Sequence, residues 1–189
     1  MILKLAYNPV GAFQTLKEAD CVRLAVILLV VRWTVSPLTT VLAMYLHDSP
    51  MALDPPFGFD RRTYRFYEIF WYGPYGIVMM LAIAQMLCLN ARQLSRNPGI
   101  SFRRTFTIVC LCFFTPWLVT VPGDYLLVHS RVNAAPAFLV PFHLTILAWE
   151  CVLVAIAVRV VFGLAKWRCA ALGLTAAALF VGLGGLVIR

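Results

Sequence analysis

Long apolar runs alternate along the chain with short polar or basic gaps. Each run has about 20 residues or more, the length that an α-helix needs to cross the hydrocarbon core of a bilayer. The runs predict five membrane-spanning helices, at about 22–46, 69–89, 105–128, 136–160 and 169–188. We therefore predict an all-α integral membrane protein with one membrane domain over residues 1–189 and with several helices kinked by proline.

The composition agrees with this pattern. Of the 189 residues, 62% are hydrophobic and 13% are charged, whereas soluble domains average about 45–50% and about 25%. The formal net charge is +8. Because the Lys and Arg residues stand in the short gaps between apolar runs, the charge favours a membrane topology over nucleic-acid binding.

The basic residues also predict the orientation of the helices, since membrane proteins keep an excess of Lys and Arg in short cytoplasmic loops. With a cytoplasmic N-terminus, that side carries about ten basic residues: Lys4, Lys17, Arg23, Arg92, Arg96, Arg103, Arg104, Arg159, Lys166 and Arg168. The other side carries about five: Arg61, Arg62, Arg65, Arg131 and Arg189. We therefore expect the N-terminus in the cytoplasm and, after five spans, the C-terminus outside.

Before the first span, Asn8 and Pro9 have the pattern of a helix N-cap followed by a first-turn proline. The residues that follow predict one or two amphipathic turns. These turns either lie in the membrane interface or form a polar lead-in to the first span. No small-residue cleavage site follows the apolar start, so we expect the N-terminus to be retained.

An aromatic cluster at Phe70 leads into the second span. The Gly73-Pro74 step falls in the first turns of that predicted helix, where proline costs little hydrogen bonding and glycine allows close approach. The preceding gap, at 47–68, combines aromatic side chains with three arginines: Arg61, Arg62 and Arg65. Such a combination is typical of a surface that docks a partner, although aromatic residues also gather at lipid interfaces for reasons of their own.

Two opposite charges are expected near the middle of the bilayer. Arg32 lies about ten residues into the first span, and Glu150 about fourteen into the fourth, which enters from the opposite side. At about 1.5 Å per residue, both reach mid-depth. They form either a structural ion pair that fixes helix packing or a charge relay or substrate site.

Other polar residues fall near the outer ends of the spans. His47, His129 and His143 are either ligands for haem iron, copper or zinc, or ordinary interfacial histidines. Asp124 follows Pro122 and Gly123, so the outer half of the third span is expected to be bent or broken. A carboxylate in an unwound segment either coordinates a cation, as in transporters, or belongs to a turn.

The chain lacks a phosphate-binding glycine loop, an HExxH segment and a nucleophile elbow, so we expect neither catalysis nor a bound metal or cofactor. Its six cysteines fall away from the predicted outer loops, which indicates free thiols. The last span carries small residues at helical spacing, including Gly173, Ala177 and Gly182. These residues permit close helix contact, either inside the bundle or with another subunit.

The segment from Tyr72 to Ile77, Tyr-Gly-Pro-Tyr-Gly-Ile, resembles the Tyr-Gly-Pro-aromatic-x-Ile motif that opens a central helix in the Yip1 domain family. The order of other motifs is similar to that family: Asn8-Pro9 with Phe13 before the first helix, Phe102 to Phe106 opening the third, and Pro116 within it. The resemblance implies five membrane helices with a cytoplasmic N-terminus. Eukaryotic members are associated with small GTPases and vesicle traffic, and carry a long acidic segment before the first helix. This chain has about twenty residues there and resembles the shorter bacterial members.

One function is expected and two alternatives stay open. The expected function is that of a non-catalytic scaffold or accessory subunit in a bacterial inner membrane, which binds partner membrane proteins or lipids. One alternative is a small transporter or channel component that uses Arg32, Glu150 and Asp124. The other is a haem-binding electron-transfer anchor that uses the three histidines.

Overall fold

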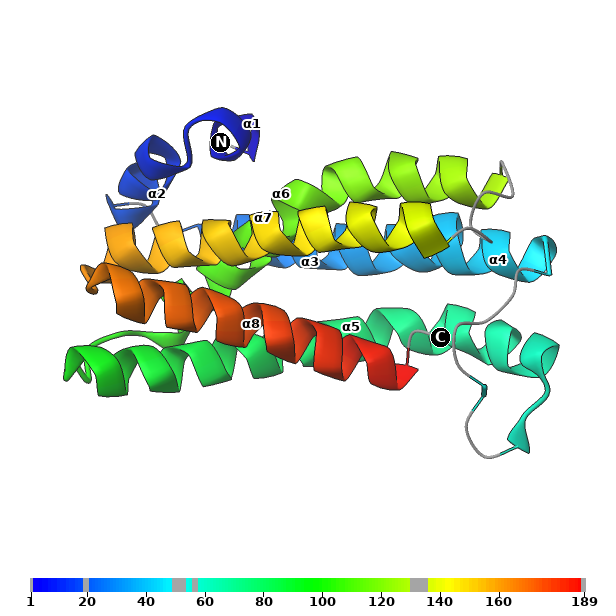
Figure 1. The fold of residues 1–189 in the computed structure, drawn as a ribbon. Helices are drawn as coiled ribbons and strands as arrows, with labels where there is room; N and C mark the ends of the chain where they lie inside the picture. The colour runs from blue at the N-terminus through cyan, green and yellow to red at the C-terminus, as the bar shows by residue number, and fades with distance from the viewer. Residues whose placement is uncertain (1, 19–20, 49–53, 56–57, 130–135, 188–189) are drawn as a thin grey trace.

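The computed structural model describes residues 2–18, 21–48, 54–55, 58–129 and 136–187. Five helical segments within these ranges are long and apolar enough to cross a membrane. They lie side by side in one bundle (Figure 1). The predicted all-α membrane fold is therefore confirmed.

The first spanning segment consists of α3 (Val22–Ser36), the π-helix η1 (Pro37–Val41) and α4 (Leu42–Leu46). The other four are α5 (Arg61–Ser95), α6 (Phe102–His129), α7 (Pro136–Phe162) and α8 (Lys166–Val187). Two short helices, α1 (Ile2–Tyr7) and α2 (Pro9–Glu18), precede them. They lie against one side of the bundle, where α1 contacts α6 and α2 contacts α7 (Figure 1).

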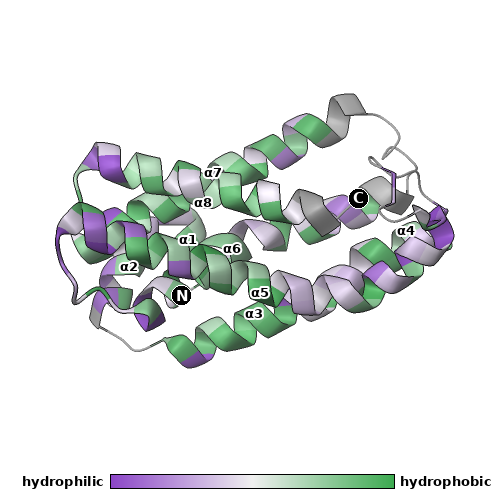
Figure 2. Ribbon diagram, turned by 90° about the horizontal axis from the view of Figure 1, so that it is seen from below, coloured by the Kyte–Doolittle hydropathy of each residue, from purple (hydrophilic) through white to green (hydrophobic). Residues whose placement is uncertain are grey.

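The bundle has two distinct ends. Helices α3, α6 and α8 begin at the end where α5 and α7 finish, and we name it the inner end, after the predicted cytoplasmic side. The opposite end, where α5 and α7 begin, is the outer end. Hydrophilic residues concentrate at both ends, and hydrophobic residues predominate along the helices between them (Figure 2). This distribution is the one that a bilayer requires.

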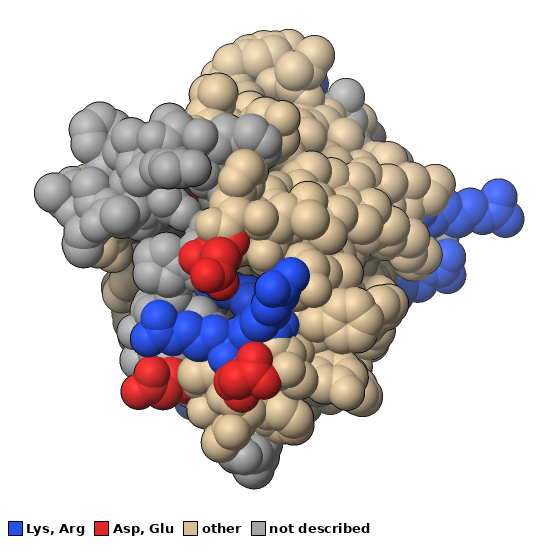
Figure 3. Space-filling view, turned by 90° about the vertical axis from the view of Figure 1, so that its right-hand side faces the viewer, with Lys and Arg blue, Asp and Glu red and all other residues tan. Residues whose placement is uncertain are grey.

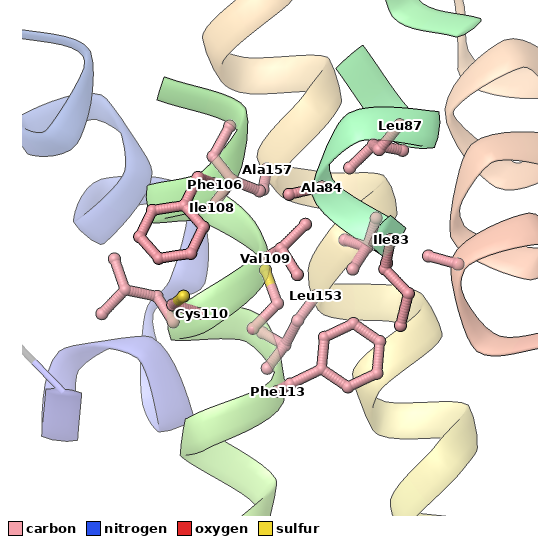
Figure 4. Close-up of a cluster of buried hydrophobic side chains, with 14 of the residues drawn as sticks. Ile83, Ala84, Leu87, Phe106, Ile108, Val109, Cys110, Phe113, Leu153 and Ala157 are labelled. Atoms are coloured by element: carbon pink, nitrogen blue, oxygen red, sulfur yellow. The ribbon is translucent and has the colours of Figure 1, made fainter. Parts of the chain in front are cut away.

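Helix α6 forms the centre of the bundle. In its most apolar 18-residue window 67% of the residues are buried, against 33–44% in the other four spanning segments. Side chains of α5 and α7 meet those of α6 in one buried cluster (Figure 4). They include Ile83, Ala84, Leu87, Ile108, Val109, Phe113, Leu153 and Ala157, all buried. Because lipid tails are as apolar as these side chains, close packing rather than water exclusion stabilises this core.

The N-terminal segment is helical and packs onto the bundle. The Asn8 Oδ1 atom accepts a hydrogen bond from the backbone N–H of Gly11 at 3.0 Å, so the predicted N-cap is confirmed. Leu5 and Phe13 are fully buried, whereas Leu3 and Tyr7 are 79% and 78% exposed. Helices α1 and α2 thus pack apolar side chains against the bundle, and α1 also exposes Leu3 and Tyr7 on the side that faces away from it.

The second spanning helix begins earlier than its apolar run predicts. Helix α5 starts at Arg61 rather than near residue 69, so the predicted gap at 47–68 is too long. The Asp60 carboxylate caps it and accepts a hydrogen bond from the Thr63 backbone N–H at 3.0 Å. Pro74 is therefore the fourteenth of 35 helical residues, and its predicted place in the first turns is wrong.

Proline affects the helices unequally. Pro37 begins the π-helix η1, so the first spanning segment departs from α-helical geometry at this proline. In contrast, α6 continues through Pro116 and Pro122, so of the predicted alternatives, bent or broken, a break near Asp124 is excluded and a bend stays a prediction. Membrane helices tolerate proline in this way when neighbouring helices and side chains surround the affected turn.

Candidate functional site

The structure brings together the two mid-membrane charges. Arg32 Nη2 lies 3.8 Å from Glu150 Oε1, and the two side chains are only 8% and 3% exposed. Arg32 Nη1 also donates a hydrogen bond to the backbone carbonyl of Phe113. The guanidinium of α3 therefore has a carboxylate partner on α7 and a carbonyl partner on α6.

Two aromatic rings enclose the same guanidinium. Arg32 Cζ lies 5.3 Å from the ring centroid of Trp33 and 5.3 Å from that of Phe180 on α8. Both distances fall within the range of cation–π attraction. Four spanning helices thus contact one charged group, an arrangement suited to fixing helix positions.

A second polar contact lies one helical turn from this centre. Trp117 Nε1 on α6 donates a hydrogen bond to Ser36 Oγ at 2.8 Å, and both residues are buried. Ser36 follows Arg32 by four residues and therefore lies on the same face of α3. Sequence reasoning missed this pair, because neither residue is charged and their spacing in the chain carries no signal.

The Tyr-Gly-Pro-Tyr-Gly motif packs against Trp33. The Tyr72 and Trp33 ring centroids are 5.4 Å apart. A Cβ atom on Gly76 would lie 2.0 Å from the indole ring, and one on Gly73 would lie 2.8 Å from the Trp33 carbonyl oxygen. The motif is therefore a mid-membrane contact surface between α3 and α5.

Pro37 gives a physical reason for the Gly73 contact. A helical residue normally donates its N–H to the carbonyl four residues earlier, and proline has no N–H. The carbonyl oxygen of Trp33 thus lacks its usual helical donor, and Gly73 lets α5 approach this oxygen closely.

The three arginines near the start of α5 have different environments. Arg65 is buried, and its Nη1 lies 2.8 Å from Glu68 Oε2, so its prediction as a partner-facing residue is wrong. The predicted surface position holds for Arg61 and Arg62, which are exposed. Arg62 Cζ lies 5.7 Å from the ring centroid of Tyr45 at the end of the first span.

Aromatic rings continue from this point over the outer part of α5. Phe66 lies at their centre, with ring centroids 6.2 Å from Tyr45, 5.9 Å from Tyr67 and 5.3 Å from Phe70. Phe66, Tyr67 and Phe70 are 46%, 49% and 62% exposed. We name Tyr45, Arg62, Phe66, Tyr67 and Phe70 the outer aromatic surface. Phe66, Tyr67 and Phe70 lie on one continuous helix and Tyr45 packs against them from α4, so few side-chain rotations remain to be lost on binding.

Of the three histidines that the sequence offers as ligands, the structure describes the side chains of His47 and His143. His143 Nε2 lies 3.2 Å from Asp124 Oδ1, which joins α7 to α6 near the outer end. His47 follows the last residue of α4, and the His129 side chain lies outside the described residues. Among the described residues, no three His, Cys, Asp or Glu side chains are placed to share a metal ion.

The small residues of α8 divide between two faces. Gly173 packs against α7, where a Cβ atom would lie 2.5 Å from the Cys151 carbonyl oxygen, and Ala177 is 6% exposed. Both residues therefore serve contacts inside the bundle. Gly182 is exposed with no atom within 4 Å of its Cβ position, so it faces outward.

Comparison with family models, with curated proteins and with solved structures finds no match for the chain. The resemblance to the Yip1 domain family therefore gains no support from these comparisons and stays a prediction.

Proposed function

We propose that the protein is a non-catalytic subunit of a bacterial inner-membrane complex, which binds a partner membrane protein through the outer aromatic surface. The observation that carries this proposal is the exposure of clustered rings beside Arg62. Aromatic residues and Arg are the residue types enriched at the energetic centres of protein interfaces.

The buried charges support a structural rather than a catalytic interior. Arg32 and Glu150 are engaged by each other, and Arg32 also by a carbonyl and two rings. A substrate would have to displace these protein partners before it reached either charge. The interior polar groups are thus better suited to holding helices together than to turnover.

Helix α5 is longer than the hydrocarbon core is thick. Its 35 residues span about 52 Å at 1.5 Å per residue, whereas the hydrocarbon core is about 30 Å thick. Gly76 contacts Trp33, the neighbour of the mid-membrane Arg32, and about ten residues counted outward from Gly76 reach Phe66. The outer aromatic surface is therefore expected near the outer boundary of the hydrocarbon. Interfacial belts favour Trp and Tyr, whose rings have a polar atom, and clustered exposed Phe residues at this boundary fit a protein partner.

Site-specific photocrosslinking in intact membranes tests this proposal. A photoreactive amino acid at position 70 is expected to give a discrete crosslinked protein, and the Phe66→Ser variant is expected to abolish that product. Position 78 is the matched control, because Val78 and Phe70 are both 62% exposed on α5 and Val78 lies about 12 Å further along the helix, away from the outer aromatic surface. The same set of products from positions 70 and 78, or lipid adducts alone from both, would reject the proposed interface.

A further inference from the structure

One polar side chain in the apolar part of α5 faces away from the bundle. Gln85 is the one polar residue between Ile77 and Leu89. It is exposed, whereas Ala84 and Leu87, on the side of the helix that faces the bundle, are buried. Among the residues that the structure describes, none forms a hydrogen bond with the Gln85 carboxamide. A carboxamide without a partner is costly in hydrocarbon, because lipid tails offer neither donors nor acceptors.

The direction of α5 points this carboxamide into the hydrocarbon. About nine residues counted inward from Gly76 reach Gln85, which is therefore expected near the inner boundary of the hydrocarbon. The Cα–Cβ bonds of a helix tilt toward its N-terminus, and α5 begins at the outer end. The Gln85 side chain thus leans back toward the membrane centre, away from the water and headgroups that a long polar side chain reaches in the opposite direction.

Exposed threonines on neighbouring helices meet the same requirement inside their own helix. Thr145 Oγ1 on α7 donates a hydrogen bond to the Pro141 carbonyl oxygen at 2.8 Å, and Thr175 Oγ1 on α8 donates one to the Ala171 carbonyl oxygen at 2.9 Å. The short threonine side chain reaches the carbonyl four residues earlier in this way. Gln85 makes no such bond, so its partner is expected outside this copy of the chain.

The surroundings of Gln85 suit a second copy of the same face. A carboxamide carries both donors and an acceptor, so two carboxamides can exchange two hydrogen bonds. Ala82 and Leu89, three residues before and four after, are exposed on the same side of α5. A small residue such as Ala82 lets two helix backbones approach closely. Two copies inserted in the same direction are related by a two-fold axis along the membrane normal, which brings each residue near the axis against its own copy.

The charges at the ends of the bundle permit this arrangement. A two-fold axis along the membrane normal places identical ends of two copies side by side. At the outer end, Lys or Arg and Asp or Glu side chains lie next to one another, so two copies do not meet there with charges of one sign (Figure 3). The basic residues of the inner end lie at the water boundary, where salt screens charges that are more than about 8 Å apart. Repulsion between two copies is therefore weak.

We propose that two copies of the chain associate through Ala82, Gln85 and Leu89 of α5, with their Gln85 carboxamides hydrogen-bonded to each other. We name these three residues the amide face. Hydrogen bonds between helices and close backbone packing drive association in bilayers, where no hydrophobic force acts between helices. The amide face lies on the inner half of α5 and the outer aromatic surface on its outer half, so this association is independent of the partner proposed there.

Energy transfer between labelled copies tests the proposal. The full chain, labelled at its N-terminus with a donor or an acceptor fluorophore, is reconstituted in phosphatidylcholine vesicles without any other protein. The dissociation constant of the dimer follows from the transfer efficiency as the lipid-to-protein ratio is raised. Gln85→Leu is expected to raise this constant by about tenfold, because the hydrogen bonds are lost while the side-chain volume is kept. Gln85→Asn keeps a carboxamide and is expected to stay within about threefold of the wild type.

Thr175→Val is the matched control, because it removes an exposed polar group whose hydrogen bond lies within α8, and it is expected to leave the dissociation constant unchanged. Phe66→Ser, at the outer aromatic surface, is expected to leave it unchanged as well. Ala82→Ile is a second variant at the amide face and is expected to weaken the dimer by about tenfold or more, because the two backbones are kept apart.

Two results would overturn the proposal. One is a wild type that stays monomeric at every lipid-to-protein ratio, or a dimer that both Gln85→Leu and Ala82→Ile leave intact. The other is a dimer that is lost only in Phe66→Ser, which would assign the second copy to the outer aromatic surface instead. Because no other protein is present in the vesicles, failure of the partner proposed for that surface would leave these measurements unaffected.

Discussion

Replacing Arg32 by Met is expected to lower the free energy of unfolding by about 3–5 kcal/mol. The substitution leaves the Glu150 carboxylate buried at 3% exposure without its cationic partner, and the Phe113 carbonyl without the guanidinium. Glu150→Met is expected to cost a similar amount, because an unpaired arginine remains inside the bundle. Both losses are measured as unfolding in mild detergent during titration with a denaturing detergent.

The double variant Arg32→Met/Glu150→Met distinguishes a structural pair from a functional one. Removing both charges leaves no buried ion unpaired, so its stability is expected to return to within about 1 kcal/mol of the wild type or to exceed it. Arg61→Met is the control for loss of one positive charge at an exposed site, with an expected change within about 0.5 kcal/mol. A double variant as unstable as the two single losses combined would contradict the structural role.

Replacing Gly76 by Ala is expected to destabilise the bundle by about 1–3 kcal/mol or more. The new Cβ would lie 2.0 Å from the indole ring of Trp33, which is only 3% exposed. An aromatic ring packed on all sides has no room to turn away, so α3 and α5 must separate. The same detergent titration measures this loss.

Gly182→Ala is the matched control for Gly76→Ala within the spanning helices. No atom lies within 4 Å of the Gly182 Cβ position, so stability is expected to stay unchanged or to rise by up to about 1 kcal/mol, since alanine favours helix. Pairing Trp33→Leu with Gly76→Ala is expected to restore part of the lost packing. If Gly76→Ala is no more harmful than Gly182→Ala, the contact between α3 and α5 is not the tight surface described here.

Hydropathy predicts the bundle well, because a bilayer imposes the length and the apolarity of each spanning helix. The same signal misplaces the start of α5, since the turns from Arg61 to Glu68 combine charged and aromatic residues and are helical through a cap and a buried ion pair. Arg65 illustrates the difficulty: its spacing from Glu68 marks a possible helix contact, but burial depends on the neighbouring helices. Helix ends outside the hydrocarbon are thus set by local chemistry that hydropathy does not report.

The charged centre is partly predictable and partly not. Depth counting brings Arg32 and Glu150 to the same level, because each helical residue advances the chain by a fixed rise. No such rule brings Trp33 to Gly76 or Trp117 to Ser36, since these contacts depend on how the helices rotate about their axes. The sequence left open whether the prolines near Asp124 bend or break α6, and the helix is not broken there, because surrounding helices decide whether a proline interrupts it.

In the function that we propose, the interior charges hold the bundle together and the outer aromatic surface binds a partner membrane protein. The most direct test of this division is the yield of the crosslinked protein from position 70 in the Arg32→Met/Glu150→Met variant. A folded double variant is expected to give the wild-type yield of crosslinked protein, because the proposal gives Arg32 and Glu150 no part in binding the partner. A double variant that folds with wild-type stability and gives no crosslinked protein would contradict the account.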